Sequence, residues 1–174
     1  MFQPLPAPVV SALAAAPAVG FSGSRSVVSP WVAPALAAVP WSVPVFVGCA
    51  GGVDAAVRSA RACRVFWARL FGCGRGSFAA RSVAFVRALA GSGGLLLSFP
   101  SGPCPAAVVP SPRSSVCFCG AGSGSWASLA FAVGSGVPVL VALPPGVAAP
   151  SWLAPLCPGW WVAAPAPAVQ LALL

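Results

Sequence analysis

Four glycine-rich turns are the parts of this sequence whose residue types could bind an anion. Glycine lets backbone N–H groups approach a ligand closely, and the start of a helix adds a partial positive charge. Serine hydroxyls in the turns can donate further hydrogen bonds. The turns are residues 22–25, 48–54, 72–77 and 120–125. A single Gly/Ser turn is weak evidence, so the prediction of a phosphate site depends on all four lying together.

The candidate ligand residues are backbone, hydroxyl and charged groups in or beside these turns. They are Gly23, Ser24, Arg25, Gly51, Asp54, Arg81, Gly122, Ser123, Gly124 and Ser125. Guanidinium groups suit phosphate, and the arginines placed at turns are Arg25, Arg75 and Arg81. Four other arginines are expected on solvated helix faces: Arg58, Arg61, Arg64 and Arg87. Trp126 follows the last turn, where it could stack on a base or, more commonly, pack in the core.

Asp54 is the one acidic residue in the chain. It falls in the first helical turn expected after the turn at 48–54. There it could cap the helix and complement its dipole, or it could accept hydrogen bonds from a ribose hydroxyl or a base amino group. The sequence favours neither role over the other.

The chain lacks the residues that several other kinds of functional site require. The chain has no histidine, which excludes Ser–His and Cys–His catalysis. Its seven cysteines show neither CxxC pairs nor another zinc-ligand spacing. Cys117 and Cys119, two apart, would share the inner face of a strand. We expect reduced thiols in a cytoplasmic protein, with no metal and no cofactor.

The amino-acid composition indicates a coding strand almost free of adenine. Ten residue types make up everything except Met1, Gln3, Asp54 and Gln170, and in the standard genetic code those ten can all be encoded without adenine. Acidic residues, lysine and threonine cannot. The net charge of +8 and the pI of about 10.4 are therefore weak evidence for a nucleic-acid partner, because the bias itself removes acids.

Short apolar runs alternate with helical stretches along the middle of the chain. The expected strands are 18–21, 45–47, 95–99, 116–119 and 137–143, and the expected helices are 31–39, 53–63, 78–90 and 126–133. This alternation predicts an α/β, Rossmann-like three-layer domain with a mostly parallel sheet of about five strands or more. In such sheets the ligand lies beyond the carboxyl ends of the strands, where the glycine-rich turns fall.

We expect three regions along the chain. Residues 1–17 form a Pro/Ala-rich tail, with a signal peptide as the less favoured alternative. Residues 18–147 form the Rossmann-like domain, and 148–174 a Pro/Trp-rich C-terminal segment. The 18 residues 126–143 approach the length of a membrane-spanning helix. Gly134, Gly136 and Pro138 divide them into helix, turn and strand, so no membrane partner is expected.

The order of these motifs resembles the SLOG superfamily over residues 18–145. The resemblance rests on Gly-Ser-Arg at 23–25, Gly-x-Ala-x-Gly-x-Asp at 48–54, an arginine at the head of a later helix, and Gly-x-Gly-Ser at 122–125. The superfamily includes the DprA/Smf single-stranded-DNA loaders and the LOG phosphoribohydrolases. The resemblance implies a Rossmannoid fold, a phosphate site, and a nucleotide or single-stranded nucleic acid as partner.

Three departures from that pattern stand out. Relatives often have Arg-Asn where this chain has Arg81-Ser82, and Gly-Thr where it has Gly124-Ser125. The catalytic glutamate of the LOG enzymes corresponds to Ser128, so the resemblance supports the fold and the phosphate site more than the hydrolase activity.

Three functions follow as hypotheses. The favoured one is binding of a nucleotide-derived ligand or single-stranded nucleic acid without catalysis. The second is a nucleotide N-glycosidase with Asp54 as the only available carboxylate. The third is an assembly protein, a homo-oligomer whose contact is made by Trp152, Trp160 and Trp161.

Overall fold

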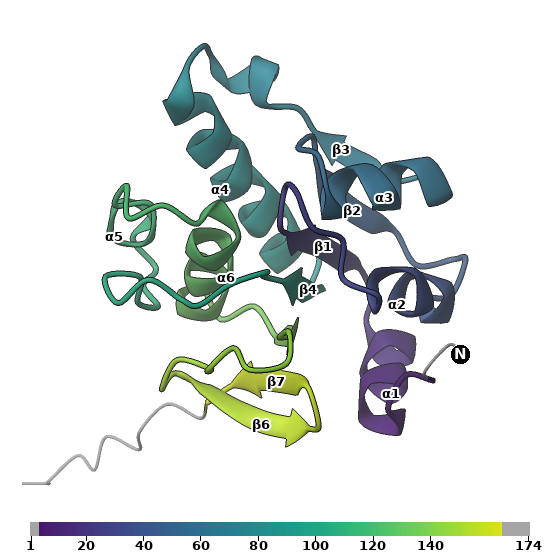
Figure 1. Ribbon diagram of the computed structural model, residues 1–174. Helices are drawn as coiled ribbons and strands as arrows, with labels where there is room; N and C mark the ends of the chain where they lie inside the picture. The colour runs from purple at the N-terminus through teal and green to yellow at the C-terminus, as the bar shows by residue number, and fades with distance from the viewer. Residues whose placement is uncertain (1–3, 165–174) are drawn as a thin grey trace, which may run out of the picture.

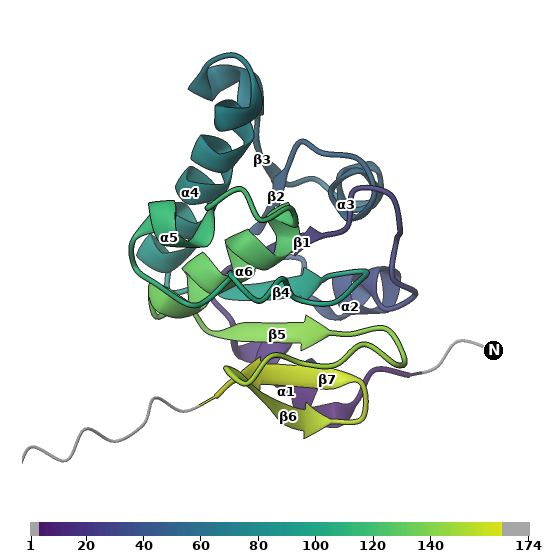
Figure 2. The ribbon, with the colours of Figure 1, turned by 60° about the vertical axis from the view of Figure 1, so that its left-hand side comes forward.

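The computed structural model describes residues 4–164, which form an α/β domain around one sheet (Figure 1). The sheet has seven strands in the order β3-β2-β1-β4-β5-β7-β6. The first five are parallel, and β7 and β6 add to the edge as an antiparallel hairpin (Figure 2). The expected Rossmann-like three-layer architecture with five or more strands is confirmed.

The strands are short, as is typical of a sheet covered on both faces. They are β1 Val19–Gly23, β2 Val45–Gly48, β3 Arg64–Phe66, β4 Leu95–Phe99, β5 Val139–Ala142, β6 Leu153–Cys157 and β7 Trp160–Ala163. The helices are α1 Ala7–Ala15, α2 Val32–Ala38, α3 Val53–Ala60, the 3₁₀ helix η1 Ala68–Phe71, α4 Arg75–Gly91, α5 Ser114–Cys117 and α6 Gly124–Gly134.

Two apolar layers cover the sheet. Side chains alternate along a strand, so Leu97 and Phe99 of β4 pack toward α1, α2 and α3, whereas Leu96 packs toward α4 and α6. Parallel pairing places Phe21 opposite Leu97 and Ser22 opposite Ser98. The carboxyl ends of β1, β2 and β4 therefore meet at one edge, and the helices that follow begin there.

The expected tail at the N-terminus is wrong for residues 7–15, which form α1. Val9 and Leu13, four residues apart on one helix face, are fully buried in the core cluster that includes α2. Pro8 lies near the helix start, where its missing N–H has no cost. Residues 1–3 of that expected tail lie outside the described residues.

The strand expected at 116–119 is also wrong, because residues 114–117 form α5. β4 pairs directly with β5, so no strand fits between them. Five prolines between residues 100 and 112 carry the chain away from the sheet instead.

The C-terminal segment expected from residue 148 contains two strands of the sheet, β6 and β7. Trp160 and Trp161 were taken as part of a region outside the domain, yet they pair with Ala142 and Val141 of β5. Residues 165–174 of that segment lie outside the described part of the chain.

Candidate functional site

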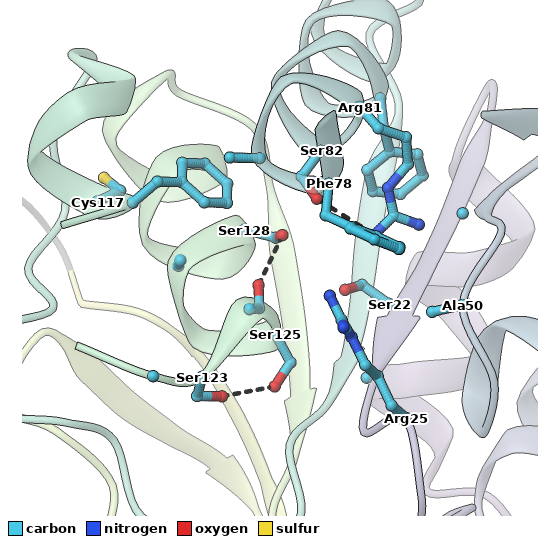
Figure 3. Close-up of a pocket in the computed structure, with 18 of the residues that line it drawn as sticks. Ser22, Arg25, Ala50, Phe78, Arg81, Ser82, Cys117, Ser123, Ser125 and Ser128 are labelled. Carbon is cyan, nitrogen blue, oxygen red and sulfur yellow. Dashed lines mark hydrogen bonds between the residues drawn. The ribbon is translucent and has the colours of Figure 1, made fainter. Parts of the chain in front are cut away.

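A cleft of about 780 Å³ opens at the carboxyl ends of the strands. All four glycine-rich turns contribute to its lining, together with the first turns of α4 and α6 (Figure 3). Nine of the ten candidate ligand residues line it, namely Gly23, Ser24, Arg25, Asp54, Arg81, Gly122, Ser123, Gly124 and Ser125. The fold therefore brings together residues that are as many as 102 positions apart in sequence, from Gly23 to Ser125.

Gly51 is the candidate that the structure places outside this lining. Its neighbour Gly52 has a φ of +58° and packs so closely on the first turn that a Cβ there would collide with the carbonyl of Ser24. The Val53 amide donates to the same carbonyl at 3.0 Å. The glycines at 51–52 therefore join the first two turns to each other, because only a residue without a side chain fits there.

A buried ion pair joins α3 to α4 beside the cleft. Arg81 Nη1 lies 3.0 Å from Asp54 Oδ2, and the side chains are only 10% and 7% exposed. The Ala50 amide donates to the same Oδ2 at 3.0 Å. Gly48 makes room for the pair, since a Cβ at that position would collide with Arg81 and with Asp54.

The expected place of Asp54 in the first turn of α3 is confirmed, although Gly52 is the N-cap of that helix. The Asp54 carboxylate is engaged by Arg81 and by a loop amide. Arg81 is 8% exposed and is part of the protein's framework rather than a freely accessible ligand group. Its Nε is nevertheless buried without a hydrogen-bond partner among the described residues.

Arg25 has a different environment from Arg81. It is exposed, and its guanidinium carbon lies 4.6 Å from the centre of the Phe78 ring. A Cβ built on Gly124 would lie 3.9 Å from Arg25 Nη2. The arginine therefore lies next to the first turn of α6, with no acidic group of the described chain beside it, since Asp54 is paired with Arg81.

The start of α6 has free backbone donors. Ser123 is the N-cap, and its Oγ accepts a hydrogen bond from the Trp126 amide at 3.4 Å. The amides of Gly124 and Ser125 have no acceptor within the helix. A cation and the positive end of a helix thus face each other, an unfavourable arrangement that an anion between them would relieve.

Ser128, which the motif resemblance aligns with the LOG glutamate, does not provide a carboxylate. It is buried, and its hydroxyl donates to the Gly124 carbonyl at 2.8 Å. The Ser123 and Ser125 hydroxyls lie 3.0 Å apart at the cleft wall (Figure 3). The serine side chains on α6 therefore stabilise its first turn.

Two of the arginines assigned to solvated faces are tied to the backbone. Arg58 donates to the carbonyls of Gly48 and Ala50 at 2.7 and 3.0 Å, which fixes the second turn. Arg61, 9% exposed, donates to three carbonyls of the segment that precedes β2: Val39, Pro40 and Val43. The expectation was wrong because loop carbonyls need donors, a demand that sequence spacing does not reveal. Arg64 lies on β3 rather than on a helix, and Arg87 is exposed on α4 as expected.

The large aromatic residues of the C-terminal half belong to the core. Trp126 is 1% exposed and its Nε1 donates to the Gly102 carbonyl at 2.9 Å, so it is not free to stack on a base. Trp160 is fully buried against Phe99 and Trp31. That burial removes Trp160 from the expected oligomer contact.

Two further outcomes concern residues near the cleft. Cys117 is buried whereas Cys119 is exposed, so the expectation of a shared inner face is wrong. Burial raises the pKa of the Cys117 thiol.

Phe78, which stacks under Arg25, was missed because its place in a helical stretch gives no sign that it faces a cleft. Among residues 4–164, no three Cys, His, Asp or Glu side chains lie close enough together to hold a metal ion.

Fold and cleft together define a Rossmann-like α/β domain with an electropositive cleft at the carboxyl edge of its parallel strands. No family model matches the chain, and neither the curated proteins nor the solved structures contain a match. The SLOG-like character of the sequence therefore remains a hypothesis that rests on its motifs.

Proposed function

We propose that this protein binds a nucleotide-derived ligand through a phosphate group held between Arg25 and the first turn of α6. The observation that carries the proposal is the position of Arg25 Nη2, which lies 3.9 Å from the Cβ position of Gly124 with no acidic group beside it. The cleft volume of about 780 Å³ falls in the range of small-molecule sites, about 300–1,000 Å³.

The rest of the cleft supports a nucleoside attached to that phosphate. Phe78, about one-third exposed, and the Arg25 guanidinium form a flat surface beside the phosphate position. The same chemistry would serve one nucleotide of a single strand, because phosphate and base recur along the strand. Free nucleotides and oligonucleotides are thus the two sources that the test must separate.

We favour binding without catalysis. A nucleotide N-glycosidase needs a carboxylate free to assist the reaction, but Asp54 is paired with Arg81 and Ser128 occupies the alternative position. The enzyme hypothesis would gain support only from turnover that depends on Asp54.

The test is isothermal titration of the full chain with inorganic phosphate, adenosine monophosphate and a short single-stranded oligonucleotide. A charged hydrogen bond contributes about 1.5–3 kcal/mol, so Arg25→Ser should weaken binding about ten- to a hundredfold. Arg25 is exposed, and the substitution should leave the melting temperature almost unchanged.

The matched control is Arg87→Ser, which removes the same charge from an exposed position on α4 outside the cleft. Equal losses in the two variants would indicate diffuse attraction to a basic surface and would contradict the proposed site. An oligonucleotide that binds far more tightly than the monophosphate would identify a single strand as the ligand.

A further inference from the structure

A second surface feature lies where η1 leads into α4. We call residues 67–75 the η1 corner. In the described part of the chain nine large apolar side chains are exposed, and three of them, Trp67, Leu70 and Phe71, fall within these residues. Leu70 is 71% exposed. In Figures 1 and 2 the start of α4 lies at the top of the view, far from the β6–β7 hairpin.

Exposed arginines accompany these apolar side chains. Arg69 and Arg75 are both exposed, and the Arg69 guanidinium carbon lies 5.2 Å from the centre of the Trp67 ring. Adenine avoidance would explain the scarcity of acidic residues, and hence the net charge, but not the positions of the arginines. Six of the nine arginines fall between residues 58 and 81, and none follows residue 113. Three of these six have partners within the fold, so the exposed Arg69 and Arg75 are among those that need another explanation.

The charges decide between possible partners. A second copy of the chain would bring arginines against arginines, because the only acidic side chain is buried with Arg81. Stacked nucleobases need an open aromatic face, but the most exposed large apolar side chain of the η1 corner is the aliphatic Leu70. The Trp67 ring already has the guanidinium groups of Arg58 and Arg69 within 5.8 and 5.2 Å. An anionic lipid surface satisfies both features, since its phosphates attract arginine and its acyl boundary accepts apolar side chains.

We propose that the η1 corner is a peripheral docking surface for anionic membranes. Leu70 of η1, 71% exposed, is the side chain that inserts, while the exposed Arg69 and Arg75 contact headgroups. The sequence led us to expect no membrane partner because no spanning segment was found. In residues 4–164 no helix has the length and apolar character needed to cross a bilayer, and peripheral docking requires none.

The surface adjoins the ligand cleft, because Arg75 of the η1 corner and the next residue, Gly76, line the cleft. Docking at the η1 corner would hold the mouth of the cleft near the headgroups. The proposal stands independently of the ligand, since Leu70 and Arg69 do not line the cleft.

The test is co-sedimentation of the full chain with vesicles of phosphatidylcholine alone or mixed with phosphatidylglycerol. We expect binding to the mixed vesicles that weakens as salt rises. Leu70→Ser should lower the partition coefficient about tenfold through lost apolar burial, and Arg69→Ser with Arg75→Ser should remove the preference for the anionic lipid. Val109→Ser, at a side chain that is 45% exposed elsewhere, is the control and should bind like the wild type.

Four results would overturn the proposal. The first is wild-type protein that does not distinguish the two vesicle types, and the second is Leu70→Ser binding as strongly as Val109→Ser. The third is a concentration-dependent mass that Leu70→Ser abolishes, which would assign the surface to a second copy. Oligonucleotide binding that depends on Arg69 but not on Leu70, without vesicle binding, would assign it to nucleic acid.

Discussion

Removal of Arg81 should destabilise the fold as well as alter the cleft. An exposed ion pair contributes only about 0.2–1 kcal/mol, but this one joins side chains that are 10% and 7% exposed at 3.0 Å. Truncation would leave the Asp54 carboxylate buried with a single amide donor, that of Ala50. Breaking a buried pair costs about 3–5 kcal/mol, so Arg81→Met should lower the melting temperature by about 6–20 °C.

The assay is urea unfolding of the wild type, Arg81→Met, Asp54→Ala and the double variant. The double variant should be at least as stable as Arg81→Met, because it no longer buries an unpaired carboxylate. Arg87→Met, which removes an exposed arginine from the same helix, should change the free energy of unfolding by less than about 0.5 kcal/mol. If the two single losses simply added in the double variant, within about 0.5 kcal/mol, the pair would not be coupled and the reasoning would be refuted.

Four other predictions concern catalysis, the reactivity of the thiols, the pH dependence of stability and the gene. The protein should release no free base from nucleoside monophosphates at rates near 1 per second, because a general acid or base contributes about 100- to 10,000-fold and Ser128 supplies neither; turnover abolished by Asp54→Ala would contradict this. Exposed Cys73 and Cys119 should react with a thiol reagent well before Cys117. Burial raises the Cys117 pKa above the ordinary value of 9.0, so its contribution to stability should be complete below that pH and be lost as pH rises through the folded-state pKa. The wild type should therefore lose more stability across that range than Cys117→Ala, and the same pH dependence in both proteins would argue against this. Glycine, alanine, proline, valine and arginine codons should rarely end in adenine, and ordinary adenine usage at third positions would remove our explanation of the composition.

The sequence was sufficient to predict the alternation of strands and helices and the edge at which the turns gather. Buried parallel strands are apolar throughout, and glycine-rich turns separate them from helices, so β1, β2, β4 and β5 could be located from local pattern alone. The same pattern misled at residues 116–119, where an apolar run forms a short helix because β4 and β5 pair directly. The strand β3 and the β6–β7 hairpin were missed because β3 spans only three residues and the hairpin is rich in proline and tryptophan.

The roles of the charged residues were decided by tertiary structure. Sequence placed Arg25 and Arg81 equally at turns. In the fold α3 and α4 lie on opposite faces of the sheet, and Arg81 reaches Asp54 past Gly48 at the end of β2, while Arg25 stays exposed beside α6. Arg58 and Arg61 likewise bind loop carbonyls that no spacing identifies. Local sequence determines backbone conformation through sterics and periodicity. An ion pair depends instead on the distance between elements that are brought together across 27 residues of chain, and that distance exists only in the folded domain.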